Sequence, residues 1–146
     1  RQMCIRDRAA LIMSDTMASK LGLTPRARFH TFALAGDDPV FMLTAPIPAT
    51  RRLLDRSGLS IDDIDAYEVN EAFAPVPMAW AHEFGADPAK LNPRGGAIAL
   101  GHALGSSGTR LLATLVNHLE ATGGRYGLQT MCEGAGMANA TIIERV

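Results

Sequence analysis

Apolar and polar positions along the chain alternate between short apolar runs and amphipathic stretches. Apolar runs bounded by turn residues predict strands at 9–13, 26–36, 65–69, 97–100, 125–132 and 137–145. Apolar residues spaced three and four apart, between capping and stop residues, predict helices at 14–21, 49–58, 71–84 and 109–121. Strands that alternate with helices and end in a hairpin predict an α/β domain with a mixed sheet and helices packed on it.

Two of these predicted helices differ in how well their sequences agree with a helix. The helix at 109–121 has an apolar stripe and is followed by the stop residues Gly123 and Gly124. In the helix at 71–84, the residues Phe73, Val76, Trp80 and Phe84 share one face. Pro77 conflicts with that helix, because a proline beyond the first turn removes a backbone hydrogen bond.

Composition narrows the class of protein. The chain has 146 residues, of which 47% are apolar and 20% charged, the balance of one globular domain with a core. The net charge of −1 and the absence of a basic patch argue against nucleic acid as a partner. No apolar run approaches the roughly 18 residues of a membrane span. Cys4 and Cys132 form no disulfide framework, so we expect a reducing, cytoplasmic setting, and no Cys or His spacing predicts a metal site.

The first eight residues, RQMCIRDR, differ in character from the rest of the chain. They lack an initiator Met at position 1 and the apolar region of a signal peptide, and they pass abruptly into an apolar run. We therefore expect residues 1–8 to be foreign or mis-assembled and residues 9–146 to form the domain of a fragment.

Three reactive or polar residues stand where a predicted strand ends: Asn70, His102 and Cys132. In α/β sheets such ends face the usual ligand crevice. His102 lies among Gly101, Gly105 and Gly108, a spacing that matches neither a P-loop nor the dinucleotide fingerprint. The glycine-rich turn is therefore a poor candidate for a nucleotide-binding loop.

Each of these residues also has a purely structural interpretation, and the residue types alone leave both open. His102 is either a neutral imidazole that acts as a base or oxyanion donor, or a histidine packed in a turn. Cys132 is either a thiol that exchanges a proton with a carbon acid or a small buried apolar residue. Asn70 either positions a water or donor at an oxyanion or caps a helix.

Taken together, three ordered motifs resemble the thiolase family, specifically its C-terminal half. Asn-Glu-Ala-Phe-Ala at 70–74 matches the NEAFA box of that family. Gly-Gly-Ala-Ile-Ala-Leu-Gly-His at 95–102, continuing to Arg110, matches its glycine-rich histidine motif. Cys-Glu-Gly-Ala-Gly at 132–136 matches its CxGGG box.

The resemblance implies an acetyl-CoA C-acyltransferase of fatty acid metabolism. Such an enzyme cleaves a 3-oxoacyl-CoA with CoA or runs the reverse Claisen condensation, with CoA as a substrate rather than a cofactor. It implies that His102 activates a nucleophilic cysteine and contributes to an oxyanion hole, that Cys132 exchanges the α-proton of acetyl-CoA, and that Asn70 holds a water of that hole. Ala72 and Phe73 would line the pantetheine tunnel.

The resemblance also implies that Gly134 offers a backbone contact near the thioester. It further implies that the protein is a homo-oligomer, either a dimer or a tetramer. The alternative is a non-catalytic, thiolase-like protein that binds acyl-CoA or lipid, or that serves in assembly. The presence of a base and a thiol together favours the enzyme.

The chain departs from the family pattern in three places. The nucleophilic cysteine of thiolases belongs to their N-terminal half, and the surroundings of Cys4 do not match it, so we expect the chain alone to be inactive. Ala103 stands where many thiolases have proline, and alanine leaves the backbone of this turn slightly freer than proline would. Ala135 replaces the second glycine of the CxGGG box, so that position must avoid positive φ or accept strain.

Overall fold

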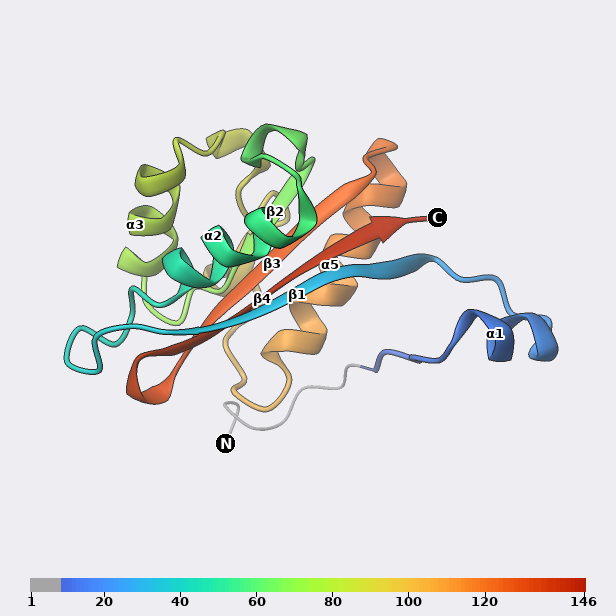
Figure 1. The fold of residues 1–146 in the computed structure, drawn as a ribbon, viewed down its shortest axis with the longest axis horizontal. Coiled ribbons are helices and arrows are strands. Elements are labelled where there is room, and N and C mark those ends of the chain that lie inside the picture. Colours follow the sequence, from blue (N-terminus) through green and yellow to red (C-terminus); the bar gives the residue numbers. More distant parts are fainter. Residues whose placement is uncertain (1–8) are drawn as a thin grey trace.

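A four-stranded sheet forms the centre of the structure, a computed structural model that describes residues 9–146 (Figure 1). Its strands are β1 (Ala27–Gly36), β2 (Ala66–Val69), β3 (Tyr126–Glu133) and β4 (Met137–Arg145), in the order β1-β4-β3-β2. β2 and β3 are parallel, and the other two pairs are antiparallel. The mixed sheet that ends in a hairpin is therefore confirmed, whereas the proposed foreign segment with Cys4 lies outside the described residues.

Five α-helices accompany the sheet in the described part of the chain: α1 (Asp15–Leu21), α2 (Pro46–Ser57), α3 (Pro75–Phe84), α4 (Gly96–Leu100) and α5 (Ser107–Thr122). Three short 3-10 helices lie at Ile61–Asp63, Pro88–Lys90 and Gly134–Gly136. α2 packs on β1 and β4, and α5 packs on β2 and β3. α1 lies apart from the sheet at the end of an extended segment (Figure 1). Among residues 9–146, no helix has the length and apolar character needed to cross a membrane.

The core has one part on each face of the sheet. Ile142 and Ile143, consecutive on β4, point to opposite faces and belong to different buried clusters. The larger cluster lies under α2 and α3 and contains Trp80, whose indole Nε1 donates to Thr50 Oγ1 over 2.9 Å. The smaller cluster is formed by α5 through Leu115 and Leu119. Helices on both faces thus leave the ends of the strands open for a site.

Local signals set most helix ends as predicted. Ser14 Oγ accepts from Met17 N at the start of α1, and Gly22 ends that helix with φ 66°. α3 starts at Pro75, later than predicted, so Pro77 falls in the first turn, where its missing N–H has no helical partner to lose. Phe73 therefore precedes the helix and is 58% exposed, outside the buried face that we predicted for it.

Two predicted strands are wrong. Residues 9–13 have no regular structure and pair with no strand of the described sheet, and Leu11 and Ile12 are exposed. Residues 97–100 lie in α4 instead of a strand. Gly95 and Gly96, both at positive φ, turn the chain there, and the Glu71 carboxylate accepts the Ile98 N–H in the first turn of α4. An apolar run of this length does not distinguish strand from helix by its pattern.

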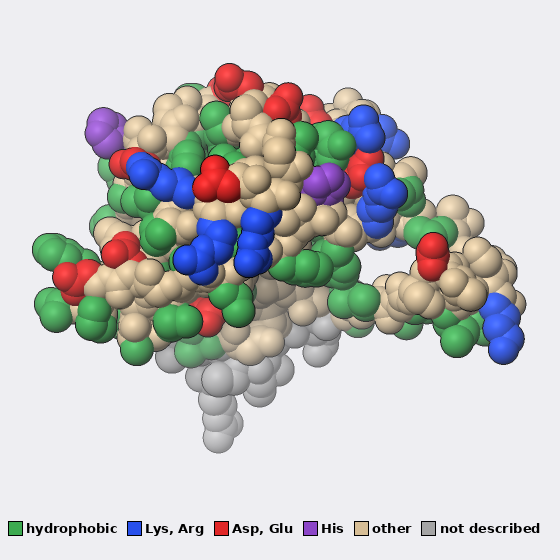
Figure 2. All heavy atoms as spheres, viewed as in Figure 1, with side chains coloured by type: hydrophobic (Ala, Val, Ile, Leu, Met, Phe, Trp, Pro, Cys, Tyr) green, Lys and Arg blue, Asp and Glu red, His purple; other side chains and the backbone are tan. Residues whose placement is uncertain are grey.

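The surface on the α2 side carries charges of both signs. Figure 2 shows Lys and Arg side chains beside Asp and Glu side chains in the middle of this face. Hydrophobic side chains gather at the tip of the β1–α2 loop, where Val40 and Phe41 are exposed (Figure 2). The Asp37–Asp38–Pro39 turn predicted between strand and helix lies at the base of this loop.

Candidate active site

The parallel pair β2 and β3 brings two of the predicted residues to one end of the sheet. Asn70 directly follows β2, and its N–H donates to Thr130 O over 3.0 Å. Cys132 lies two residues further along β3. The start of α5 packs against the same region, because a Cβ on Gly108 would lie 3.3 Å from Met131 Cε. Asn70 and Cys132 therefore lie at the carboxyl ends of β2 and β3, where the start of α5 also packs. The predicted strand end before His102 is wrong, because His102 follows α4.

Asn70 is a buried amide with an unused acceptor. The residue is 1% exposed, and its Oδ1 has no hydrogen-bond partner among the described residues. The helix-cap interpretation is wrong, since α3 begins at Pro75 with Ala74 as its N-cap. A buried carbonyl oxygen without a donor is a position where an ordered water is expected.

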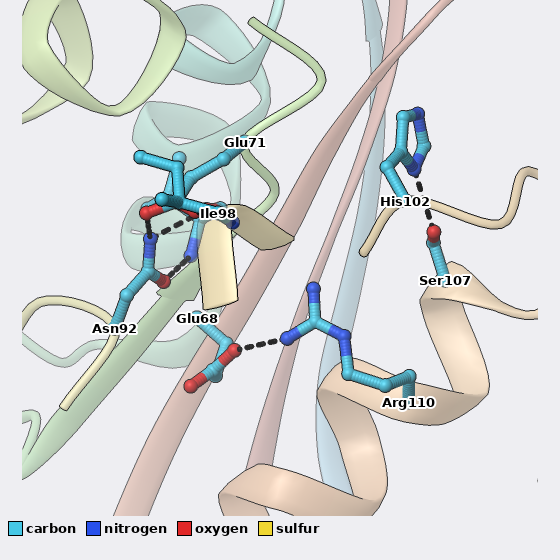
Figure 3. A network of polar contacts seen from close by, with 8 residues as sticks. Glu68, Glu71, Asn92, Ile98, His102, Ser107 and Arg110 are labelled. Carbon is cyan, nitrogen blue, oxygen red and sulfur yellow. Dashed lines mark hydrogen bonds and ion pairs between the residues drawn. The ribbon is translucent and has the colours of Figure 1, made fainter. Parts of the chain in front are cut away.

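His102 is half-buried and is held by the first residue of α5. Its Nδ1 lies 2.6 Å from Ser107 Oγ, and that hydroxyl donates to Ala103 O over 3.0 Å (Figure 3). Burial lowers the pKa of His102 below its ordinary value, and the charge of Arg110 lowers it further. Burial and the Arg110 guanidinium thus favour the neutral imidazole, the first of the two interpretations of His102.

Cys132 is half-buried against the larger core cluster. Burial raises the pKa of its thiol, an effect that a backbone hydrogen bond opposes and the charge of Glu133 reinforces. The thiol is therefore protonated at neutral pH and can act as a proton donor. In the region the structure describes, no hydrogen bond links the side chains of Asn70, His102 and Cys132 to one another.

Glu71 connects the NEAFA box to the glycine-rich histidine motif. Its Oε2 accepts from Ile98 N over 2.6 Å, and its Oε1 accepts from Asn92 Nδ2 over 3.0 Å (Figure 3). Asn92, at φ 45°, also bonds both backbone groups of Val69, the residue before Asn70. These contacts fix the segment that carries Asn70 against the segment that leads to His102.

The residues expected to bind CoA do not line a cavity. Ala72 is half-buried, Phe73 is exposed, and Gly134 is exposed with nothing within 4 Å of a Cβ placed on it. An open cavity of about 360 Å³ lies next to Ala72 and Phe73 in the chain, lined by Glu71, Ala74, Pro77, Met78, Leu91, Asn92, Gly95 and Ile98. The described residues thus present Ala72, Phe73 and Gly134 on an open surface.

The hairpin that follows Cys132 is held by the β1–α2 loop. Gly136 has φ 77°, and a Cβ there would lie 2.7 Å from Asp37 O, so this glycine permits the close approach. The Gly136 carbonyl accepts from Asp37 N over 2.7 Å. Ala135 has φ 62°, so this position adopts the strained backbone conformation, the second of the two possibilities stated from its sequence.

Three residues of the site region were not identified from the sequence. Ser107 could not be distinguished from Ser106, since both hydroxyls stand near the start of α5. Glu68 does carry a signal, because a carboxylate inside a short apolar strand needs a buried partner. That partner is Arg110, whose Nη1 lies 3.1 Å from Glu68 Oε2 (Figure 3).

Comparison with known proteins assigns the domain. The family model described as "Thiolase, C-terminal domain" matches residues 23–145. The steroid 3-ketoacyl-CoA thiolase FadA6 of Mycobacterium tuberculosis is 62% identical over 138 residues, which are 94% of this chain and 34% of that protein. The 3-oxoadipyl-CoA/3-oxo-5,6-dehydrosuberyl-CoA thiolase of Escherichia coli is 51% identical over 140 residues, 94% of this chain and 35% of that protein.

A solved structure agrees with the sequence relatives. The crystal structure of the Bacillus anthracis acetyl-CoA acetyltransferase superposes with a TM-score of 0.88 at 36% identity, over 92% of this chain and 34% of that one. The chain therefore spans about a third of the length of the relatives it matches.

Proposed function

The chain belongs to the thiolase family, whose C-terminal domain it forms, and from this we propose that it supplies the acid–base residues of a thiolase active site. The proposed reaction is cleavage of a 3-oxoacyl-CoA by CoA, or the reverse Claisen condensation of acetyl-CoA. One observation carries the proposal: a buried amide and a protonated thiol lie at one end of the parallel strand pair, and a neutral imidazole precedes the helix whose start packs there.

In this proposal His102 is the proton acceptor for a nucleophilic thiol. A proton on Nδ1 is shared with Ser107 Oγ, which leaves the lone pair of Nε2 available. The neutral state favoured by burial is the state that a general base requires at neutral pH. The nucleophile itself would come from the part of a thiolase that corresponds to the remaining two thirds of the relatives.

Cys132 is the proposed proton donor in the cleavage direction. After the nucleophilic sulfur has added to Cβ of the 3-oxoacyl-CoA, the bond between Cα and Cβ breaks and the acyl group stays on that sulfur. The electron pair of the broken bond goes to Cα, which takes the proton from Cys132 Sγ. A thiol whose pKa is raised by burial holds that proton until the carbanion forms. In the condensation direction the thiolate removes the same proton from acetyl-CoA.

Asn70 is proposed to hold the water that stabilises the oxyanion. Its unpartnered Oδ1 can accept a hydrogen from a water, whose other hydrogen then faces the thioester oxygen. Ala72, Phe73 and Gly134 lie on the open surface beside the site, where pantetheine could pass. We expect CoA to act as a substrate and the protein to be a homo-oligomer.

A fusion tests the proposed function. The region of the 62% identical M. tuberculosis relative that precedes its matching segment is joined to this chain, and cleavage of acetoacetyl-CoA and of longer 3-oxoacyl-CoA by CoA is measured. We expect activity from the fusion, loss with His102→Ala, Cys132→Ser or Asn70→Ala, and no turnover by the 146-residue chain alone. Cleavage that survives all three substitutions would refute these roles.

The same variants address the non-catalytic alternative. A protein that only binds acyl-CoA would show binding in a titration of this chain with acetyl-CoA, and the affinity would not depend on the base or the thiol. An inactive fusion that is folded and still binds acyl-CoA would favour that alternative over the enzyme.

A further inference from the structure

Glu68 and Arg110 form an ion pair in the interior, between β2 and α5. Arg110 Nη1 lies 3.1 Å from Glu68 Oε2, and the two side chains are 5% and 0% exposed. Both charges lose their hydration there, and apolar residues of similar volume are often at least as stabilising as such a pair. Stability of the fold is therefore a weak explanation for two charges at this position.

Each partner of the pair lies close in the chain to a residue of the candidate site. Glu68 precedes Asn70 by two residues at the end of β2, where the ladder to β3 continues through Asn70 N, so their side chains project from the same face. Arg110 follows Ser107 by three residues on α5, so these two share a face of the helix.

The ion pair consequently joins the two halves of the site. On one side is the strand that carries Asn70, and on the other is the helix start whose Ser107 contacts the imidazole of His102. Figure 3 shows the pair between β2 and α5, with the imidazole near the start of α5. A shift of either element would change the separation of Asn70 and His102.

The charges of the pair also act on the imidazole. The Arg110 cation lowers the pKa of His102, and Arg110 is the charged group that acts on this ring. Three groups act on or lie beside the Glu68 carboxylate. Arg110 of α5 lowers its pKa, and Glu71 of the segment after β2 raises it. On β3 its partner in the sheet is Gln129, whose amide is uncharged. Burial raises the pKa of Glu68 to about 7, so its charge changes within the neutral range.

We propose that Glu68 and Arg110 are positioning residues of this site: their ion pair fixes the separation of Asn70 and His102, and their charges set the electrostatic potential at the imidazole. Neither residue touches the substrate in this proposal, and its catalytic consequence rests on the proposed function. The link between the pair and the imidazole is a property of the chain itself and can be measured without turnover.

The experiment follows the ¹⁵N signals of His102 against pH in the 146-residue chain. We expect two steps: protonation of the ring below its ordinary pKa, and a second inflection near pH 7 that reports the ionisation of Glu68. Glu68→Gln should remove the second step. Arg110→Met should move both steps to higher pH, because the Arg110 cation lowers the pKa of Glu68 and of His102, whereas Arg110→Lys should leave the first step low.

Glu144→Gln is the matched control. Glu144 is also buried and paired with arginines, Arg28 and Arg125, but it lies opposite Tyr126 at the other end of the sheet. Both His102 steps should remain in this variant. A second step that persists in Glu68→Gln, or that is missing from the wild-type chain, overturns the proposal. If Arg110→Met does not fold, Glu68→Gln and Arg110→Lys still decide it.

The active fusion provides the catalytic readout. A misplaced base of this kind lowers turnover on the order of 100-fold, so Glu68→Gln should reduce kcat with little change in KM. An inactive wild-type fusion together with the expected ¹⁵N pattern would reject the proposed function and leave the coupling of the pair to His102 intact. An active fusion without the expected ¹⁵N pattern would support the proposed function and reject the coupling of the ion pair to His102.

Discussion

His102 Nδ1 lies 2.6 Å from Ser107 Oγ, and the Ser107 hydroxyl has a second acceptor in Ala103 O, 3.0 Å away. A hydroxyl has one proton to donate. When that proton goes to the carbonyl of Ala103, the oxygen of Ser107 can only accept, and the hydrogen it accepts must be on Nδ1 of His102. The contact therefore selects the tautomer whose Nε2 is free to take a proton.

Replacing Ser107 by Ala should release this tautomer. We expect the ¹⁵N shifts of His102 in Ser107→Ala to move towards a mixture of the two neutral forms, and the active fusion to lose about 10- to 100-fold in kcat, a size typical of losing part of a general base. Ser106→Ala is the control, because the Ser106 hydroxyl bonds Ala103 O over 3.5 Å, whereas the imidazole's hydrogen bond goes to Ser107. Equal effects of the two substitutions would show that Ser107 has no special role.

The thiol of Cys132 should react slowly at neutral pH. Its pKa is raised, mainly by burial, so the thiolate is scarcer than in an ordinary cysteine and alkylation by iodoacetamide should accelerate only at alkaline pH. The rate is followed by mass spectrometry of the peptide that contains Cys132, and the same peptide in urea gives the unfolded reference. A folded chain that reacts as fast as the unfolded one at pH 7 would contradict the burial argument.

The stability of the chain should depend on pH through Glu68. The folded pKa of about 7 lies above the ordinary value of 4.5, so the folded state binds the proton more tightly. The resulting stability is fully present below pH 4.5 and is lost as the pH rises to about 7, a change of about 3 kcal/mol. Urea unfolding at several pH values should show this loss in the wild-type chain relative to Glu68→Gln, and parallel curves would refute it.

Gly96 should be intolerant of a side chain. Its φ is 59°, and a Cβ there would lie 2.5 Å from Glu71 Oε2, the atom that accepts the Ile98 N–H. We expect Gly96→Ala to cost about 2 kcal/mol or more in the free energy of unfolding. Gly105→Ala is the matched control from the same motif, because nothing lies within 4 Å of its Cβ, and it should change stability by less than about 0.5 kcal/mol.

Elements with strong local signals were predictable from the sequence. Ser14 and Gly22 delimit α1, the stripe from Leu111 to Leu119 marks α5, and the turn after Cys132 sets the final hairpin. In each case the residues that define the element also supply its caps or its buried face. That Asn70 and Cys132 each follow or end a strand was predictable, whereas their position at the same sheet end depends on the parallel pairing of β2 with β3.

Features that depend on distant contacts were not predictable. Whether residues 97–100 form a strand or a helix depends on Glu71, whose carboxylate lies 27 positions away in sequence from Ile98 and accepts its N–H. The Glu68–Arg110 pair spans 42 positions, and its partners are chosen by the packing of α5 on β2. No local pattern encodes which carboxylate reaches which donor.

The sheet order has a consequence for folding. β1 has its hydrogen-bonded neighbour in β4, so Ala27 pairs with Arg145, and the first strand of the sheet is joined to the last. A pairing between segments so far apart in sequence forms slowly, because the entropy of closing the intervening loop is lost before the contacts form. The sheet is therefore complete only when β4 has inserted between β1 and β3.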